Sequence, residues 1–211
     1  MKRFWPFLAL AAILLFFAPF VLSGCGKQEV PTQSSFLGSE PDSSADDGSL
    51  SIALDNGYIN TPITPWLPLG GYAFGRYVSG RGYHLGDDCV RSPGKAVHAI
   101  WHGRVKYARY NSGGWGYLMI VEYYINNLPF CVVYGHLGGT MYPGEGNWVT
   151  RGQYIGTVGS TQESGQTTPH LHLGIHYGGY GAPTGTYPSW CKGYASSTSG
   201  WFNPTDFMNY W

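Results

Sequence analysis

The sequence has few charged residues, and no segment of it concentrates basic ones. Only 11% of the 211 residues are Asp, Glu, Lys or Arg, and the formal net charge is zero. Proteins that bind nucleic acid usually carry a basic patch or stripe, so we expect no nucleic-acid partner. The chain also lacks any run of ten or more residues that has helical periodicity and is free of glycine and proline, which excludes a helical bundle.

The chain is instead rich in glycine and in aromatic side chains. It contains 32 glycines, and 17% of its residues are Phe, Trp or Tyr. From Tyr58 onward, short runs of Val, Ile, Tyr and Trp alternate with glycine turns, which is typical of β-structure. The expected strands are 97–107 (two strands that turn near His102 and Gly103), 117–124, 130–134 and 154–158. We therefore predict a single small all-β domain, mostly antiparallel and sandwich- or barrel-like, over residues 58–211.

The first 25 residues resemble a bacterial lipoprotein signal. Lys2 and Arg3 precede an apolar run from Phe4 to Val21, and Leu22-Ser23-Gly24-Cys25 then places small residues before a cysteine. In such a signal Cys25 would carry lipid and anchor the protein to a membrane. An uncleaved transmembrane anchor is the alternative, because about 18–20 apolar residues can span a bilayer. Both interpretations predict a membrane-tethered protein of the cell envelope, outside the cytoplasm.

Residues 26–57 differ in composition from the remainder of the chain. They are rich in Ser, Asp, Glu, Pro and Gln and have almost no aromatic side chains, so they cannot bury enough apolar surface to fold alone. We expect a flexible acidic linker here. The predicted organisation is therefore a signal over 1–25, a linker over 26–57 and a folded domain over 58–211.

Two histidines stand two residues apart in the apolar stretch from Thr168 to His176. In a strand, residues i and i+2 point to the same face, so His170 and His172 would project side by side. Leu171, Leu173 and Ile175 would then point to the other face, into a core. Two imidazoles on one face indicate a metal site or a proton-transfer site that needs further partners.

Two other segments supply such partners. His84 and Asp88 are four residues apart, so they lie on one face of an extended segment, and Gly86 between them lets the backbone bend. Two histidines and a carboxylate form the ligand set of a catalytic zinc site with one position left for water. His136 follows an apolar strand, where functional side chains often lie.

Together these motifs resemble the lysostaphin-like (LytM-type) zinc endopeptidases. The matching motifs, in chain order, are Phe74-Gly-Arg76, His84-Leu-Gly-Asp-Asp88, Val97-His-Ala99, Gly103-Arg-Val105, Tyr134-Gly-His-Leu137, Val149, Gly152-Gln153, Ile155-Gly156, Val158-Gly-Ser160 and Pro169-His-Leu-His-Leu173. The resemblance implies a small β-sandwich-like fold with a groove lined by loops. It also implies a substrate class, the peptide cross-links of bacterial peptidoglycan.

The resemblance assigns roles to five residues. His84, Asp88 and His172 would hold one zinc ion per chain, and His136 and His170 would stand over its open coordination position. Zinc lowers the pKa of bound water and polarises a carbonyl. No glutamate lies beside a ligand as a general base, so His136 and His170 are the candidates to move the proton and stabilise the oxyanion.

Two other functions remain open. Some relatives keep this fold without its zinc ligands and activate other wall hydrolases, so a non-catalytic regulator is one alternative. A metallopeptidase that acts on a peptide outside the wall is the other.

Several features have no assigned role. His98, His102 and His176 match no family position. The segment Gly178–Trp201, rich in glycine, serine and aromatics, would set specificity, occlude the groove or bind a partner. Aromatic residues that could line the groove are Tyr83, Trp115, Trp148, Tyr177 and Tyr180, although ordinary packing is the alternative for each.

The cysteine count is odd once Cys25 is assigned to lipid. Cys89, Cys131 and Cys191 remain in an oxidising compartment, where one disulfide and one free thiol are expected. Cys89 follows Asp88, and Cys131 lies five residues before His136. In regular strands these odd offsets place both thiols on the face away from the metal. We therefore expect a Cys89–Cys131 disulfide, with Cys191 as the competitor for either partner.

Overall fold

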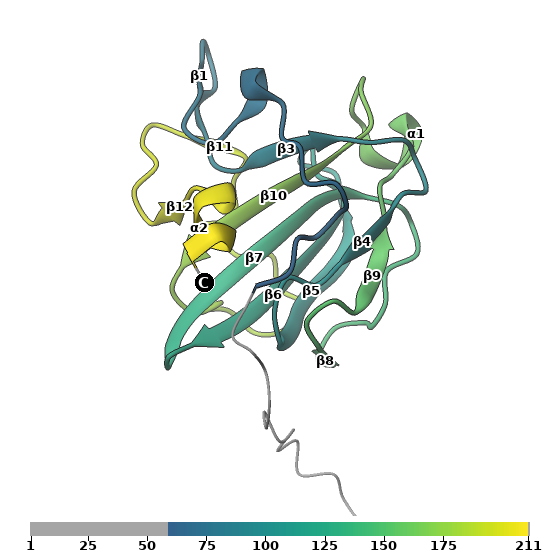
Figure 1. Cartoon of the computed structure of the whole chain (residues 1–211), viewed down its shortest axis with the longest axis vertical. Helices are drawn as coiled ribbons and strands as arrows, with labels where there is room; N and C mark the ends of the chain where they lie inside the picture. Colours follow the sequence, from purple (N-terminus) through teal and green to yellow (C-terminus); the bar gives the residue numbers. More distant parts are fainter. Residues whose placement is uncertain (1–58, 211) are drawn as a thin grey trace, which may run out of the picture. The chain divides into compact units, whose positions relative to one another are not determined.

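The computed structural model describes residues 59–210 (Figure 1). Its elements are η1 (Gly70–Tyr72), β1 (Tyr77–Val78), β2 (Gly82–His84), β3 (Asp87–Val90), β4 (Ala96–His98), β5 (Gly103–Asn111), β6 (Gly116–Ile125), β7 (Leu128–Leu137), β8 (Trp148–Val149), β9 (Tyr154–Thr157), α1 (Thr161–Ser164), β10 (His170–Tyr177), β11 (Tyr194–Ala195), β12 (Trp201–Phe202) and α2 (Pro204–Tyr210). Strands dominate this region, and its helices are short. The predicted all-β fold is confirmed, as an open antiparallel arrangement and not as a closed barrel.

The central sheet has the strand order β12-β10-β7-β6-β5-β8, and β3 also pairs with β10. Figure 1 shows β10 running between β3 and β7. The first half of β10 pairs with β3 and its second half pairs with β12, so the edge opposite β7 is shared by two short strands. Strand β10 therefore brings residues from β3 and β7 to its own histidines.

The two strands expected between Val97 and Tyr107 exist, but they belong to different sheets. Strand β4 pairs with β9, and β5 pairs with β6. Ala99 and Ile100 in the segment between them are buried in the main core, so this segment crosses the interior instead of closing a hairpin. Glycine turn signals alone cannot distinguish these two outcomes.

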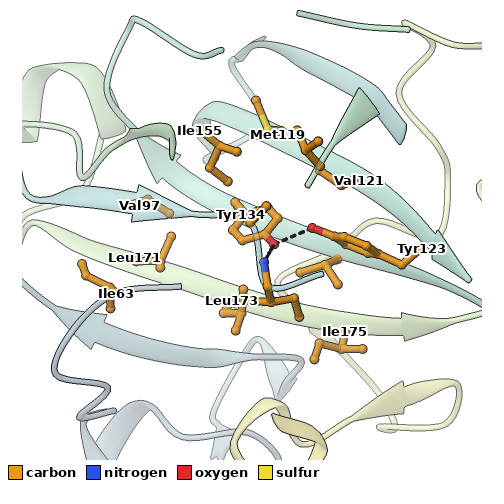
Figure 2. Close-up of a cluster of buried hydrophobic side chains, with 14 of the residues drawn as sticks. Ile63, Val97, Met119, Val121, Tyr123, Tyr134, Ile155, Leu171, Leu173 and Ile175 are labelled. Atoms are coloured by element: carbon orange, nitrogen blue, oxygen red, sulfur yellow. Dashed lines mark hydrogen bonds between the residues drawn. The ribbon is translucent and has the colours of Figure 1, made fainter. Parts of the chain in front are cut away.

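One face of the central sheet packs into the main hydrophobic core (Figure 2). Leu171, Leu173 and Ile175 of β10 are fully buried there, as their alternation with the histidines predicts. Tyr134 of β7 lies among them. Its hydroxyl oxygen is 2.6 Å from that of Tyr123 and accepts a hydrogen bond from the Ile100 backbone N–H at 3.0 Å, so this buried polar group is satisfied.

The opposite face of the sheet carries a second apolar cluster. Its buried members are Tyr107, Trp115, Leu118, Ile120, Cys131, Val133, Tyr180 and Cys191. Tyr180 and Cys191 come from the 178–201 segment, and Trp190 and Trp201 pack against the same cluster. This segment therefore covers a sheet face and supplies part of the core, which its glycine-rich composition does not predict.

The structure corrects the expected disulfide, because Cys89, Cys131 and Cys191 are all free. Cys89 pairs across strands with Leu171 and lies in the main core. Cys131 pairs with His176 and lies in the second cluster, with Cys191. The sheet thus separates Cys89 from Cys131. The expectation was wrong because it counted from His136 as if that residue continued a regular strand.

Some predictions fall outside residues 59–210. The signal over 1–25, the lipidated Cys25 and the linker over 26–57 lie there, so the three-part organisation stays a prediction. Among the residues that the structure describes, none of the helices has the length and apolar character needed to cross a bilayer.

Candidate metal centre

Strand pairing brings three predicted metal ligands together. His172 on β10 lies directly opposite Asp88 on β3, and side chains of directly opposed residues share a face of the sheet. His84 ends β2, and Leu85 and Gly86 separate it from the start of β3. The three side chains therefore come from three strands, of which β2 and β3 follow each other closely and β10 comes much later in the chain.

The ligand atoms converge on one point. His172 Nδ1 lies 2.9 Å from Asp88 Oδ1 and 3.1 Å from His84 Nε2. His84 Nε2 lies 3.4 Å from Asp88 Oδ1. Zinc bonds of about 2.0–2.2 Å separate tetrahedral ligand atoms by about 3.3–3.6 Å. This triangle is close to that size, so the residues fit a zinc ion with one further position open.

The protonation states of these groups also suit a metal. His84, Asp88 and His172 are only 2%, 7% and 2% exposed. Burial alone would raise the pKa of Asp88, but hydrogen bonds from His172 and His84 outweigh it and hold that pKa far below its usual range. Burial lowers the pKa of His172 despite Asp88. A charged carboxylate and neutral imidazole are the forms that bind zinc.

His136 and His170 lie beside this triangle. Their ring centroids are 4.5 Å apart, and His170 Nε2 is 3.6 Å from Asp88 Oδ2. His170 Nδ1 is 2.7 Å from the Thr168 carbonyl oxygen. A carbonyl only accepts, so Nδ1 carries a proton, and in that neutral tautomer the lone pair is on Nε2.

His136 is buried and neutral. Burial is the main cause that lowers the pKa of His136 to about 3, and His170 and His172 lower it further. Its Nδ1 atom is buried and has no hydrogen-bond partner among the described residues.

Trp115 packs against these histidines from one side. Its ring centroid lies 5.0 Å from that of His172 and 5.8 Å from that of His136. Gly135 makes room for it, because a Cβ there would lie 2.7 Å from the indole. Trp115 Nε1 donates to the Tyr187 hydroxyl at 2.8 Å, which connects the 178–201 segment to the site.

A groove of about 710 Å³ opens over the five residues. The other residues that line it are Leu69, Tyr72, Arg81, Val90, Gly113, Gly114, Trp115, Gly165, Gln166, Thr167, Thr168, Gly193 and Tyr194. Most are small, neutral or aromatic. Of the aromatics expected in the groove, only Trp115 lines it. Tyr83, Trp148 and Tyr177 are exposed elsewhere, and Tyr180 is buried in the second cluster.

Comparison with known proteins agrees with this geometry. Residues 82–183 match the model of Peptidase family M23, a range that contains all five site residues. The Lipoprotein NlpD of Yersinia enterocolitica is 37% identical over 92 residues, which are 44% of this chain and 88% of that protein. The chain belongs to peptidase family M23.

Two further relatives extend this comparison. The murein hydrolase activator NlpD of Escherichia coli (strain K12) is 35% identical over 121 residues, which are 57% of this M23 chain. The match spans only 30% of that relative's length. The antimicrobial peptidase lysostaphin from Staphylococcus simulans superposes with a TM-score of 0.52 at 25% identity, over 72% of this chain and 55% of lysostaphin. The resemblance and fold inferred from the motifs are confirmed.

The other histidines of the M23 domain lie outside the groove lining. His98 on β4 packs against Tyr154, and His102 accepts a hydrogen bond from the Arg151 backbone. His176 does share the face of His170 and His172, as strand parity predicts. However, its ring is stacked on Trp190 at 4.2 Å, so it belongs to the second cluster.

Sequence reasoning missed Arg81 and Tyr194 as groove residues. Tyr194 on β11 pairs with His84 on β2, and its ring lies 4.9 Å from that of His84. No motif or spacing connects residues so far apart in the chain. Only the pairing of β11 with β2 places them together.

Proposed function

We propose that this protein is a zinc-dependent endopeptidase that hydrolyses peptide cross-links of bacterial peptidoglycan. The observation that carries the proposal is the convergence of His84, Asp88 and His172 on one point, with His136 and His170 beside it. A structural zinc site is closed by four protein ligands, whereas a catalytic site keeps one position open. Three ligands with two further histidines favour catalysis.

The side chains divide the chemistry between them. Zinc held by His84, Asp88 and His172 would supply a Lewis acid and would activate water at neutral pH. His170 accepts the proton of the attacking water, because its Nε2 lone pair is free while Nδ1–H is fixed on the Thr168 carbonyl. His136 lines the groove beside His170, so it is the contact for the substrate or for the leaving amine.

The substrate class is supported by the names of the relatives. The Escherichia coli relative is a murein hydrolase activator, and lysostaphin is an antimicrobial peptidase. The location rests on a similar argument. The Yersinia relative is named a lipoprotein, which supports lipidation at Cys25 and an anchored position in the cell envelope.

The name of the Escherichia coli relative also favours a second function, the activation of other wall hydrolases. Such a role needs no zinc and no turnover. Cleavage of a peptide outside the wall is a third possibility that needs both. Metal content and substrate therefore separate the three functions.

The test is digestion of purified sacculi of several cross-link types by the full-length protein in detergent. Reactions contain zinc, chelator, or chelator followed by restored zinc, and mass spectrometry identifies the released fragments. We expect cross-link fragments only when zinc is present. Release that survives chelation would overturn the zinc mechanism. No release, with about one zinc bound per chain, would favour a substrate outside the wall. No release and no zinc would favour the activator.

Two variants test the assignment of residues. His136→Ala removes a residue beside the metal ligands, so we expect retained zinc and loss of turnover. His98→Gln is the control, because this histidine lies outside the groove. Retained zinc and retained activity in His172→Ala would show that the ligand assignment is wrong.

A further inference from the structure

The groove carries one permanent cation, Arg81, that has no acidic partner in the described part of the chain. Arg81 is the only Lys or Arg among the lining residues, and Asp88 is the only acid. Asp88 is engaged by His84 and His172, which leaves no carboxylate for Arg81. A guanidinium at a groove that has no acidic partner is a ready binding site for an anion.

Arg81 is exposed, and contacts of its backbone and of its guanidinium orient it. Its backbone N–H donates to the Val78 carbonyl at 3.0 Å in the turn between β1 and β2. Its guanidinium carbon lies 5.5 Å from the centroid of the Tyr194 ring, a cation–π distance. Gly82 lets β11 approach, because a Cβ at this residue would lie 2.3 Å from the Ala195 carbonyl oxygen.

Tyr194 also connects Arg81 to the metal centre. Its ring lies 5.5 Å from the Arg81 guanidinium and 4.9 Å from the ring of His84. An extended peptide advances about 3.4 Å per residue. Arg81 is therefore within reach of a group about three residues or fewer from the bond over the metal.

Neutral segments supply most of the remaining lining. Gly113, Gly114, Gly165, Gln166 and Thr167 bring no charge, so these segments neither repel an anionic substrate nor compete with Arg81 for it. A guanidinium matches a carboxylate through paired N–H donors. The lining thus suits a peptide of small residues that has one carboxylate close to the scissile bond.

We propose that Arg81, held on the ring of Tyr194, binds a carboxylate of the peptide substrate within about three residues of the scissile bond. The inference rests on the proposed function and names its substrate class, a cross-link with an acidic side chain or a free C-terminal carboxylate. An all-glycine bridge without a nearby carboxylate is a poor substrate. Arg81 is a specificity-determining residue, whereas Tyr194 positions it.

Three matched synthetic cross-linked peptides test this proposal. One has both carboxylates free, one has the acidic side chain amidated, and one has the C-terminus amidated. Cleavage by the zinc-loaded full-length protein gives kcat/KM, and fluorescence anisotropy with the His136→Ala variant gives Kd. We expect about a tenfold loss in both measurements on amidation of the carboxylate that Arg81 binds, which identifies that carboxylate.

Substitutions of Arg81 complete the test. In Arg81→Gln the free acid should fall to the level of the amide, with no further loss on amidation, and Arg81→Lys should keep part of the discrimination. Arg104→Gln is the control, because Arg104 bonds the Gly146 carbonyl and does not line the groove. Unchanged discrimination in Arg81→Gln would overturn the proposal. An equal loss for acid and amide would do so too, since Arg81 would then only support the site.

The experiment distinguishes failure of the proposed endopeptidase activity from failure of the proposed carboxylate site. If no peptide is cleaved while binding still discriminates acid from amide through Arg81, the proposed endopeptidase activity is wrong and the carboxylate site stands. If every peptide is cleaved at one rate and bound with one affinity, the activity stands and the carboxylate site is wrong.

Discussion

His136 shows how one backbone angle can place a candidate site residue at the groove. Along β7, Val132 and Tyr134 point into the main core, so strand alternation would place His136 there too. Its φ of 61° lies in the left-handed region, which costs a non-glycine residue about 1–2 kcal/mol. The side chain lies instead beside His170. The strained backbone of His136 therefore places its side chain at the groove instead of in the core.

At the residue scale, Gly86 should be indispensable for the metal centre. A Cβ at this position would lie 2.4 Å from the Leu173 carbonyl oxygen and 2.6 Å from His172 Nε2. The backbone must shift to relieve this overlap, so Gly86→Ala should displace His172 and weaken zinc binding at least tenfold. Zinc titration with a chromogenic competitor measures this, and a circular dichroism melt gives the accompanying loss of stability.

Gly144→Ala is the matched control for this substitution. No heavy atom lies within 4 Å of a Cβ at Gly144, and its backbone is not left-handed. Zinc affinity should stay at the wild-type value. Equal effects of the two substitutions would show that Gly86 has no special relation to the site.

At the element scale, the site depends on strand pairs and on the segment that covers them. The proposed ligands come from β2, β3 and β10, so none of these strands would hold the metal alone. Asp87, next to the proposed ligand Asp88, has a structural role. Its side chain accepts hydrogen bonds from the Phe74 backbone and from Thr205, which fixes the chain entering α2.

The 178–201 segment should influence turnover through Tyr187. The Tyr187 hydroxyl accepts from Trp115 Nε1 and donates to the Cys191 carbonyl at 2.5 Å. Tyr187→Phe leaves the indole N–H without this partner, which loosens the ring that packs on His136 and His172. We expect kcat to fall about three- to tenfold with KM nearly unchanged, measured on a cross-linked peptide.

Tyr177→Phe is the comparison for Tyr187→Phe. Tyr177 ends β10 on the exposed surface and does not line the groove. Loss of the Tyr177 hydroxyl should leave kcat at the wild-type value. A similar fall in both variants would show that the segment does not act on the site through Tyr187.

At the scale of the whole molecule, zinc should stabilise the folded domain by connecting two of its sheets. The ligands belong to the small β1-β2-β11 sheet and to the central sheet, so an ion that binds only the folded state stabilises both. At a free concentration of 100 times Kd the gain is about 2.7 kcal/mol. We expect the Tm of the chelated protein to rise by about 5–10 °C.

Scanning calorimetry with and without zinc measures this rise. Asp88→Asn keeps the shape of the ligand but not its charge, so zinc should then raise the Tm far less. Asp206→Asn is the control on the exposed first turn of α2. A rise that persists in Asp88→Asn would place the stabilising zinc elsewhere.

The sequence by itself determined the family and the β-fold, and it predicted the five site residues. These predictions were possible because strand alternation and short motifs depend on residues close together in the chain. His170 and His172 share a face for a local reason, as do Leu171, Leu173 and Ile175. The family and fold are confirmed, and the functional roles of the five residues are part of the proposed function.

Only the tertiary structure decided which distant residues meet. It separated Cys89 from Cys131, because the sheet lies between the clusters that hold them. It also brought Tyr194 onto His84 and Arg81 to the groove through the pairing of β11 with β2. These contacts depend on how strands far apart in the chain pair, and no local pattern specifies that pairing.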